Sequence, residues 1–285
     1  MELLVRIKQH LKPIKIAFDN WRFNREAEKH VGVHYECPFC GFHSDDLALL
    51  GIDSPAARKY KTVGMGVRPG MCWKCRAKDK EKLLYLYLRD IAKIFDGHPL
   101  RILHIAPEDI IAQRILTMKS IDYICGDFFA KGYMYPPYVH NMNVLNLPFA
   151  DGDFDMVMCN HVLEHIEDDR KAMRELFRVL KKGGVGLLQV PMSNILDKTL
   201  EDSSVKTSEE RLKVFGQTDH LRLYGLDDKD RLEECGFRVE LFKFPIEVID
   251  KYGMDKEENL YEEISYTKLA QILGVNEYTM QRIFY

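Results

Sequence analysis

Residues 143–191 decide the fold; they read NVLNLPFADGDFDMVMCNHVLEHIEDDRKAMRELFRVLKKGGVGLLQVP. Within them, FDMVMCN (154–160) is a short apolar run typical of a buried strand. A helical pattern follows over 162–181 and ends in Lys-Lys-Gly-Gly, because lysines suit a helix C-terminus and glycine supplies the left-handed residue that ends it. GVGLLQVP (184–191) is a further predicted strand. Strand, helix and strand in this order predict a parallel βαβ unit.

The same alternation continues on both sides of this stretch. Upstream, LRILHIA (100–106) and IDYICGD (121–127) are predicted strands on either side of a helix, EDIIAQRILTM (108–118). Downstream, a short helix in DKDRLEECGF (228–237) leads to a late strand, RVELFKF (238–244). We therefore expect an α/β fold, a Rossmann-like and mostly parallel sheet with helices on both faces, plus a small N-terminal zinc-ribbon module.

Changes in composition and the positions of glycine and proline divide the rest of the chain into segments. Helices are expected around 3–18 and 20–29, short strands and loops over 35–76, a one-sided helix over 79–95, and a loop or lid over 192–218. The predicted parts are an N-terminal helical segment (1–30), a four-cysteine module (31–77), a linker helix (78–98), the α/β domain (99–250) and a C-terminal helical extension (251–285).

Bulk composition sets broad limits on function. The chain has 285 residues, 46% hydrophobic and 30% charged, as is ordinary for a globular protein. It has neither the roughly 20-residue apolar run of a membrane span nor a signal peptide, so we expect a cytoplasmic protein without a membrane partner. Net charge is −3, although residues 1–100 carry 18 Lys and Arg against 12 Asp and Glu. This mild excess fits either an anionic partner or a solvated surface.

Four of the seven cysteines form two C-x2-C pairs separated by 31 residues. Two such knuckles close a tetrahedron around zinc, and four thiolates leave no open position, so the ion is expected to be structural. Gly41 allows the first turn, and Pro69-Gly70 is expected to bend the chain before the second pair. His34 or His43 as a substitute ligand, and four buried free thiols, are the alternatives. Whether the module staples the fold or grips substrate stays open. The predicted metal ligands are Cys37, Cys40, Cys72 and Cys75.

The stretch 143–191 resembles class I S-adenosylmethionine-dependent methyltransferases. In that family an LPF-x-D-x-x-FD-x-V run leads into the fourth strand, an L-E-H helix follows, and L-K-x-G-G precedes the fifth strand. LHIAPE (103–108), the two C-x2-C pairs and FGQTDHLRLYG (215–225) together are similar to a bacterial subgroup that bears a zinc ribbon. The resemblance implies a methyltransferase that uses S-adenosylmethionine.

The resemblance also implies which residues hold the cofactor. Ala106 stands where the first glycine of the family's loop would be, and this departure permits an inactive, scaffold-like relative as an alternative. Asp127 is expected to accept hydrogen bonds from both ribose hydroxyls, and Asn143 to pair with the adenine edge. The methionine end is expected to lie against the close of strand 154–160. The expected cofactor residues are Ala106, Pro107, Glu108, Asp127, Asn143, Asn160 and His161, with Cys159 beside them.

Methyl transfer needs mainly alignment of the acceptor, and a base only where the acceptor is a hydroxyl or a protonated nitrogen. The predicted catalytic residues are His161, His220 and Asp219, with His165 a further candidate base. His161 and His165 are four apart on the predicted helix, where they equally fit a packing role. H-V-L-E-H lacks the H-E-x-x-H order of zincins, so no metal is expected there. Arg222 is a candidate for binding an anionic group of the substrate, with Tyr224 nearby.

Residues 266–284, YTKLAQILGVNEYTMQRIF, resemble a helix-turn-helix with Gly274 at the turn and a second helix from about Asn276. Positive charge is sparse there, which disfavours DNA contact. The function expected first is methyl transfer to a small molecule or glycan. The alternatives are an RNA or protein methyltransferase that docks through the zinc module, and a non-catalytic scaffold. RNA contact would use the aromatic residues Trp21, Tyr60 and Trp73.

Overall fold

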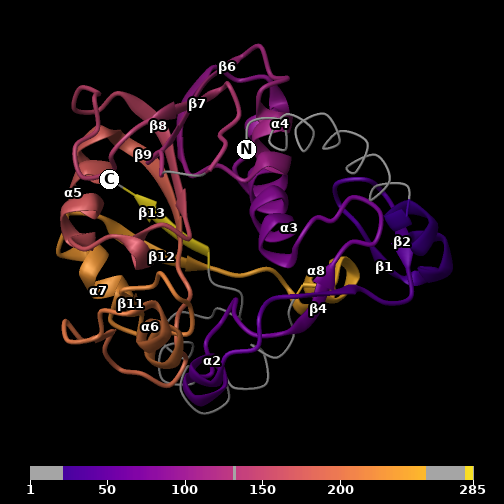
Figure 1. Cartoon of the computed structure of the whole chain (residues 1–285). Helices are drawn as coiled ribbons and strands as arrows, with labels where there is room; N and C mark the ends of the chain where they lie inside the picture. The colour runs from indigo at the N-terminus through magenta and orange to yellow at the C-terminus, as the bar shows by residue number, and fades with distance from the viewer. Residues whose placement is uncertain (1–21, 131–132, 255–279, 285) are drawn as a thin grey trace, which may run out of the picture.

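The computed structural model describes residues 22–130, 133–254 and 280–284, and its centre is a seven-stranded sheet (Figure 1). The strand order is β12-β13-β9-β8-β5-β6-β7; the five strands β9-β8-β5-β6-β7 are parallel to one another, whereas β13 is antiparallel to both β9 and β12. The strands are β5 (Leu100–Ile105), β6 (Ile121–Asp127), β7 (Val139–Asn141), β8 (Phe154–Asn160), β9 (Leu180–Gln189), β12 (Arg238–Phe242) and β13 (Met280–Phe284).

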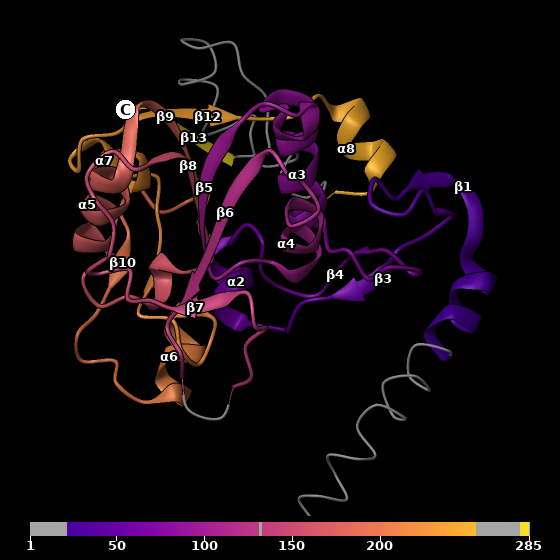
Figure 2. The same cartoon turned by 90° about the horizontal axis from the view of Figure 1, so that it is seen from above.

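Helices cover both faces of this sheet (Figures 1 and 2). On one face lie α3 (Asp79–Leu86), which continues as a π-helical turn over Tyr87–Ile91, and α4 (Asp109–Ile115). On the other lie α5 (Asp169–Val179) and α7 (Asp228–Glu233). A 3-10 turn (Ile94–Asp96) joins the linker helix to β5.

Side chains of successive strand residues alternate between two hydrophobic cores. Ile102 and Met156 pack in the core under α3 and α4, whereas Leu103 and Val157 pack in the core under α5. Since neighbouring side chains in a strand point to opposite faces, a strand that is apolar at every position must be covered on both sides. The predicted Rossmann-like fold is confirmed.

The four-cysteine region consists of short antiparallel pairs and one helix. A helical stretch over 22–27 and a 3-10 turn (Glu28–His30) precede it. Its elements are β1 (Val31–Glu36), β2 (His43–Ser44), β3 (Ala48–Leu50), α2 (Pro55–Tyr60) and β4 (Arg68–Met71). Pro69-Gly70 lies inside β4, where the register against β3 shifts between Pro69 and Met71, so the expected irregularity falls within a strand. The helix α2 was not expected; Ser54 caps it by accepting from the Ala57 N–H at 3.2 Å, and Pro55 opens it.

The helix expected over 162–181 is shorter at both ends. Residues Leu163–His165 form a 3-10 turn, and α5 begins only at Asp169, because the Asp168 side chain accepts from the Lys171 N–H at 2.9 Å and caps it. At the other end, β9 begins at Leu180, so Lys-Lys-Gly-Gly lies in an irregular start of a strand and does not end the helix. His161 and His165 consequently flank a turn and do not share a helix face.

The expected loop over 192–218 holds regular structure. It contains β10 (Leu200–Glu201) and α6 (Ser208–Phe215), and β10 pairs with β11 (Arg222–Leu223). A capping box explains α6, because Thr207 and Glu210 each bond the other's backbone N–H. The helix packs on α2, and the Ser193 hydroxyl donates to the Tyr60 carbonyl at 2.6 Å. This segment therefore joins the four-cysteine region to the sheet.

The C-terminal expectation is partly wrong. After α8 (Ile246–Tyr252), the described chain resumes at Met280–Phe284 as β13, which pairs antiparallel with β9 and with β12. These residues were expected to be helical; as a strand they supply the backbone partners that β9 and β12 would otherwise lack. The expected helix over 3–18, Gly274 and the start of the second helix lie outside the described residues. Nor is any described helix long and apolar enough to cross a membrane.

Candidate active site

The predicted cofactor residues meet at one edge of the sheet, where the parallel strands β5, β6 and β8 end. Ile105, the last residue of β5, pairs with Gly126 on one side and with Cys159 on the other. Ala106, Asp127 and Asn160 follow these paired residues, so they are neighbours at this edge. Ligands of open α/β sheets bind outside the carboxyl ends of the strands, which makes this edge the candidate site.

The loop after β5 forms its tight turn without glycine. Ala106 adopts a left-handed backbone with φ of 49°, and its N–H donates to the Gly126 carbonyl at 2.7 Å. An L-residue pays about 1–2 kcal/mol for this conformation, and such residues gather at functional sites. His161 is a second example, with φ of 54° and its N–H bonded to the Gln189 carbonyl at 2.7 Å. Two adjacent strands thus end in left-handed residues facing the same edge.

Asp127 is half-buried at the end of β6. Burial raises the pKa of its carboxyl group, and a backbone hydrogen bond from Phe128 partly offsets the shift. The carbonyl of Asp127 accepts from the Met142 N–H at 2.8 Å, which fixes the end of the strand. Asn143 is exposed nearby, and its side-chain oxygen accepts from the Leu145 N–H at 2.9 Å. The amide nitrogen of Asn143 and the second lone pair of its oxygen are left for the adenine-facing role expected of it.

Glu108 turns inward. Its carboxylate lies 3.0 Å from Nε2 of buried His104, whose Nδ1 lies 2.7 Å from the Tyr123 hydroxyl. Burial acts to raise the pKa of Glu108, but the hydrogen bond and charge of His104 outweigh burial and lower it. Lys80, in the first turn of α3, is half-buried and within electrostatic reach of Glu108 and Glu164; burial lowers its pKa. Lys80 was not predicted from the sequence, because nothing in a linker-helix pattern marks one lysine as close to Glu108 and Glu164.

Asn160 has a buried side-chain amide that forms no hydrogen bond within the described residues. It is buried at the end of β8, yet neither its Nδ2 nor its Oδ1 has a hydrogen-bond partner among the described residues. A buried amide without partners costs about 1–3 kcal/mol for each unsatisfied group. A ligand with both donors and acceptors, such as the amino-acid end of S-adenosylmethionine, suits such an amide.

Beside Asn160, three histidines surround the buried carboxylate of Glu164. Its Oε1 lies 3.6 Å from Nδ1 of His161 and 3.9 Å from Nε2 of His165, while Oε2 has no partner within the described residues. Burial acts to raise the pKa of Glu164, but the hydrogen bond and charge of His161, then the charges of His165 and His220, lower it overall. The group therefore holds a negative charge in the protein interior.

His220 and Asp219 occupy different places. His220 is buried, burial lowers its pKa, and its Nδ1 finds no partner in the described part of the chain. Asp219 is exposed; its backbone carbonyl lies 3.3 Å and its carboxylate 3.5 Å from Nδ1 of His165. Asp219 thus contacts Nδ1 of His165, whereas Nε2 is the nitrogen closer to Glu164.

Arg222 supports the site and is not available to a substrate. It is buried, and its guanidinium donates to the Leu163 carbonyl at 2.8 Å, to the Glu167 carbonyl at 2.9 Å and to the Ile166 carbonyl. Its Nε pairs with Glu201 at 2.6 Å. The expected anion-binding role of Arg222 is therefore wrong, because every part of its fork is occupied.

Tyr224 is likewise internal. Its hydroxyl donates to the Asp169 carboxylate at 2.8 Å, and this carboxylate also pairs with Arg231 at 2.9 Å. The hydrogen bonds of Tyr224 and Asp169 anchor the start of α5 to the chain beyond β11.

The four cysteines of the two C-x2-C pairs lie together. The Sγ atoms of Cys37 and Cys75 are 3.4 Å apart, and those of Cys40 and Cys72 are 3.8 Å apart. Zinc–sulfur bonds of about 2.3 Å in a tetrahedron place sulfurs about 3.8 Å apart, whereas a disulfide would bring them to about 2.05 Å. His34 and His43 are not in this cluster.

The two knuckles that carry these thiols are alike. The Gly41 N–H bonds the Cys37 carbonyl at 2.9 Å, and the Arg76 N–H bonds the Cys72 carbonyl at 3.0 Å. Gly41 and Arg76 both have φ of 64°, so Arg76 takes the place of glycine in the second turn.

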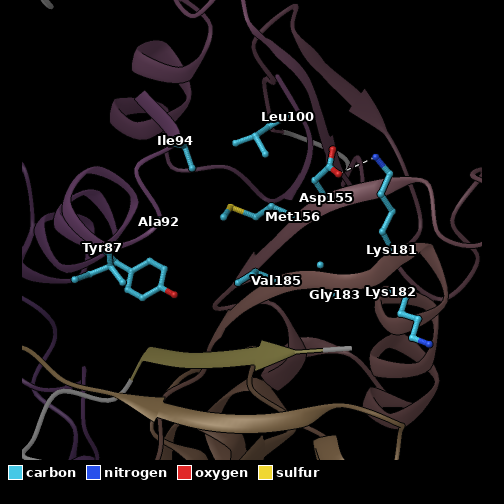
Figure 3. Close-up of a pocket in the computed structure, with 12 residues that line it drawn as sticks. Tyr87, Ala92, Ile94, Leu100, Asp155, Met156, Lys181, Lys182, Gly183 and Val185 are labelled. Atoms are coloured by element: carbon cyan, nitrogen blue, oxygen red, sulfur yellow. Dashed lines mark hydrogen bonds and ion pairs between the residues drawn. The ribbon is translucent and has the colours of Figure 1, made fainter. Parts of the chain in front are cut away.

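A cavity of about 380 Å³ lies at the opposite edge of the sheet (Figure 3). Leu100 and Met156, from the starts of β5 and β8, line it together with Val185 and Tyr87. Lys181 at its rim is paired with Asp155 at 2.8 Å. None of the predicted cofactor residues lines this cavity, so it is separate from the candidate active site.

Comparison with known proteins bears on the edge that carries Asp127 and Asn160. Residues 113–188 match the family model of a methyltransferase domain. The match runs from α4 to β9 and includes both residues. Ajmaline N-methyltransferase of Rauvolfia serpentina is 34% identical over 71 residues, which are 25% of this chain and 23% of that protein. The methyltransferase YcgJ of Bacillus subtilis is 43% identical over 56 residues, 19% of this chain and 22% of that protein.

The chain thus spans less than a quarter of the length of these two curated relatives. The crystal structure of YcgJ aligns with 70% of this chain and 96% of its own, with 18% identity and a TM-score of 0.39. The family-model match supports a methyltransferase domain over residues 113–188, and it leaves the acceptor open.

Proposed function

We propose that the protein transfers a methyl group from S-adenosylmethionine to a small-molecule or glycan acceptor. The observation that carries this proposal is the methyltransferase-domain match over residues 113–188, which includes half-buried Asp127 and unpartnered Asn160 at one strand edge. S-adenosylmethionine supplies a methyl group already activated by its sulfonium. The work left to the protein is to bind, orient and exclude water.

The residues at the edge divide this work. Asp127 would accept hydrogen bonds from the ribose hydroxyls. The side-chain amide of Asn160 would form hydrogen bonds with the amino-acid end of the cofactor. The left-handed backbone of Ala106 keeps the turn that lets the chain approach the cofactor, which favours an active enzyme over a scaffold. Lys80 is placed to attract the cofactor's carboxylate, because it lies at the same edge.

A base at this edge points to an acceptor that loses a proton. His161 directly follows β8 and is half-buried, with Nδ1 3.6 Å from the Glu164 carboxylate. A carboxylate in this position stabilises the imidazolium that forms when histidine accepts a proton. We therefore propose a hydroxyl or a protonated nitrogen as the methylated group, with His161 as the base.

A small acceptor is favoured over RNA by the surroundings of the aromatic residues. The ring of Trp73 is stacked on His30 at 3.7 Å between centroids, and its Nε1 donates to Asp46 at 2.7 Å. One face of Trp73 is thus already covered. Retention on immobilised RNA that falls steeply with salt would favour the RNA alternative instead.

Calorimetric titration with S-adenosylhomocysteine tests the cofactor site. Two hydrogen bonds to a charged group are worth about 3 kcal/mol together at the low end, so D127A should weaken binding about 100-fold. D122A is the matched control, because Asp122 is an exposed aspartate of the same strand, paired with Arg101; its affinity should stay within about twofold of the parent. Equal binding by D127A and the parent, or no binding by the parent, would refute the proposal.

For the cysteine cluster, we propose a structural zinc ion bound by four thiolates, as in the zinc-ribbon subgroup that the sequence resembles. The sulfur separations of 3.4 and 3.8 Å suit this ion. The cluster also adjoins the active site through the chain: two residues after Cys75, Ala77 is fully buried, and α3 with Lys80 follows at once. Loss of zinc is therefore expected to disturb the position of Lys80 as well as the module.

A further inference from the structure

A second group of metal-ligand side chains lies in the described residues, apart from the cysteines. Glu164, His165 and His220 each offer one ligand atom, and these atoms all lie within 4.8 Å of one another. No short sequence motif contains this group, because 54 residues lie between His165 and His220. It adjoins Asn160 and His161 at the edge proposed to bind the cofactor.

The ligand atoms of the three side chains are close enough to share one ion. Nε2 of His165 lies 3.9 Å from Oε1 of Glu164, and the rings of His165 and His220 are 4.8 Å apart at 83°. Zinc ligands at about 2.0–2.1 Å in a tetrahedron lie about 3.4 Å apart, so small side-chain rotations bring these atoms onto one ion.

Two of the three side chains each have a polar atom that forms no hydrogen bond within the described residues. Glu164 and His220 are both buried, and Glu164 Oε2 and His220 Nδ1 lack hydrogen-bond partners there. A buried carboxylate oxygen without a donor is costly, and a cation removes that cost.

The ligands are also held in place, as metal ligands usually are. Asp219 contacts Nδ1 of His165, which leaves Nε2 for the site, in the manner of carboxylates that orient metal-bound histidines. The Leu221 N–H donates to the Glu164 carbonyl at 2.8 Å, which ties His220 to the turn that carries the other two ligands. The Arg222 guanidinium fixes the same turn by donating hydrogen bonds to the backbone carbonyls of Leu163 and Glu167.

We propose that Glu164, His165 and His220 bind a divalent cation of the zinc class. Two imidazoles and one carboxylate are a ligand set of catalytic zinc sites, which keep a fourth position for water or substrate. An acceptor oxygen in that position would lie at the edge where methyl transfer is proposed. The role toward the acceptor rests on the proposed function; the cation site itself does not.

Co²⁺ is the probe for the test, because it replaces zinc and reports its ligands by absorption. The full-length protein is stripped of metal and dialysed against Co²⁺ at neutral pH, and bound cobalt is counted per chain. H165A is the main variant, since His165 is half-exposed and its loss leaves the core intact. E164Q is the second, because it keeps the shape of the side chain. H140A, an exposed histidine of β7, is the matched control.

The parent is expected to bind one equivalent of Co²⁺ more than H165A and E164Q do, and H140A is expected to match the parent. The near-ultraviolet thiolate band of cobalt at the cysteines should stay unchanged in H165A, which shows that the lost equivalent is the histidine site. Equal cobalt counts in the parent and in folded H165A and E164Q, checked by circular dichroism, would overturn the proposal. The titration with S-adenosylhomocysteine is read separately, so a failed cofactor site and a failed cation site give different results.

Discussion

Arg222 is expected to be the main support of the turn that carries Glu164 and His165, and R222M tests this. In the parent, the guanidinium donates to the carbonyls of Leu163 and Glu167 at 2.8 and 2.9 Å. Methionine keeps an unbranched apolar side chain and removes every donor. The change therefore leaves buried carbonyls unpaired with little loss of packing.

The expected loss follows from these contacts. Each hydrogen bond from a charged donor is worth about 1.5–3 kcal/mol, and breaking a buried ionic pair costs about 3–5 kcal/mol. The bonds of one side chain are not additive, so we expect R222M to lower the free energy of unfolding by about 3–5 kcal/mol.

Urea unfolding followed by far-ultraviolet circular dichroism measures this difference. R238M is the control, because Arg238 is exposed and its pairing with Glu240 at 3.2 Å is a surface ion pair; it should change stability by less than about 0.5 kcal/mol. If R222M behaved like R238M, Arg222 would not support the turn. A stable R222M that also kept the parent's affinity for S-adenosylhomocysteine would remove the link between this arginine and the site.

Three further outcomes are expected. Burial raises the pKa of Asp127 above its usual value, so the charged form of this carboxyl group costs stability as pH rises through that pKa. D127N should therefore have a higher Tm than the parent at pH 7 and an equal Tm near pH 3. An equal Tm of the two proteins at pH 7 would contradict this. L176A should lose about 2–5 kcal/mol in urea unfolding, since Leu176 is fully buried under the sheet; a loss below about 1 kcal/mol would contradict its placement. A chelator should lower the Tm of the parent more than that of C72S, which has lost the cysteine site; equal responses would count against a structural metal at the cysteines.

Much of the fold was predictable because its signals are local. The run FDMVMCN is apolar at nearly every position, as a strand covered on both faces must be, and the two C-x2-C pairs are fixed by the geometry of a tight turn. The place of Asp127 at the end of β6 was predictable because the end of a strand follows directly from where the apolar run stops. The methyltransferase-domain match over 113–188 lies where the sequence resemblance placed it.

The errors have equally physical causes. The apolar period of 162–181 continues through a turn and into a strand, and only the cap at Asp168 and the pairing of β9 decide the boundaries. The last strand, Met280–Phe284, takes its form from the two neighbouring strands that need partners, and five residues carry too little pattern to show this.

What the sequence by itself determined is the alternation of strands and helices, the paired cysteines and the residue types that end each strand, because each depends on residues close in the chain. Only the tertiary structure decided that Lys80 comes within electrostatic reach of Glu108 and Glu164, that Arg222 is consumed by backbone carbonyls, and that His220 meets Glu164 and His165. Such contacts join elements far apart in sequence. They depend on how helices and loops pack against the sheet, which no local period encodes.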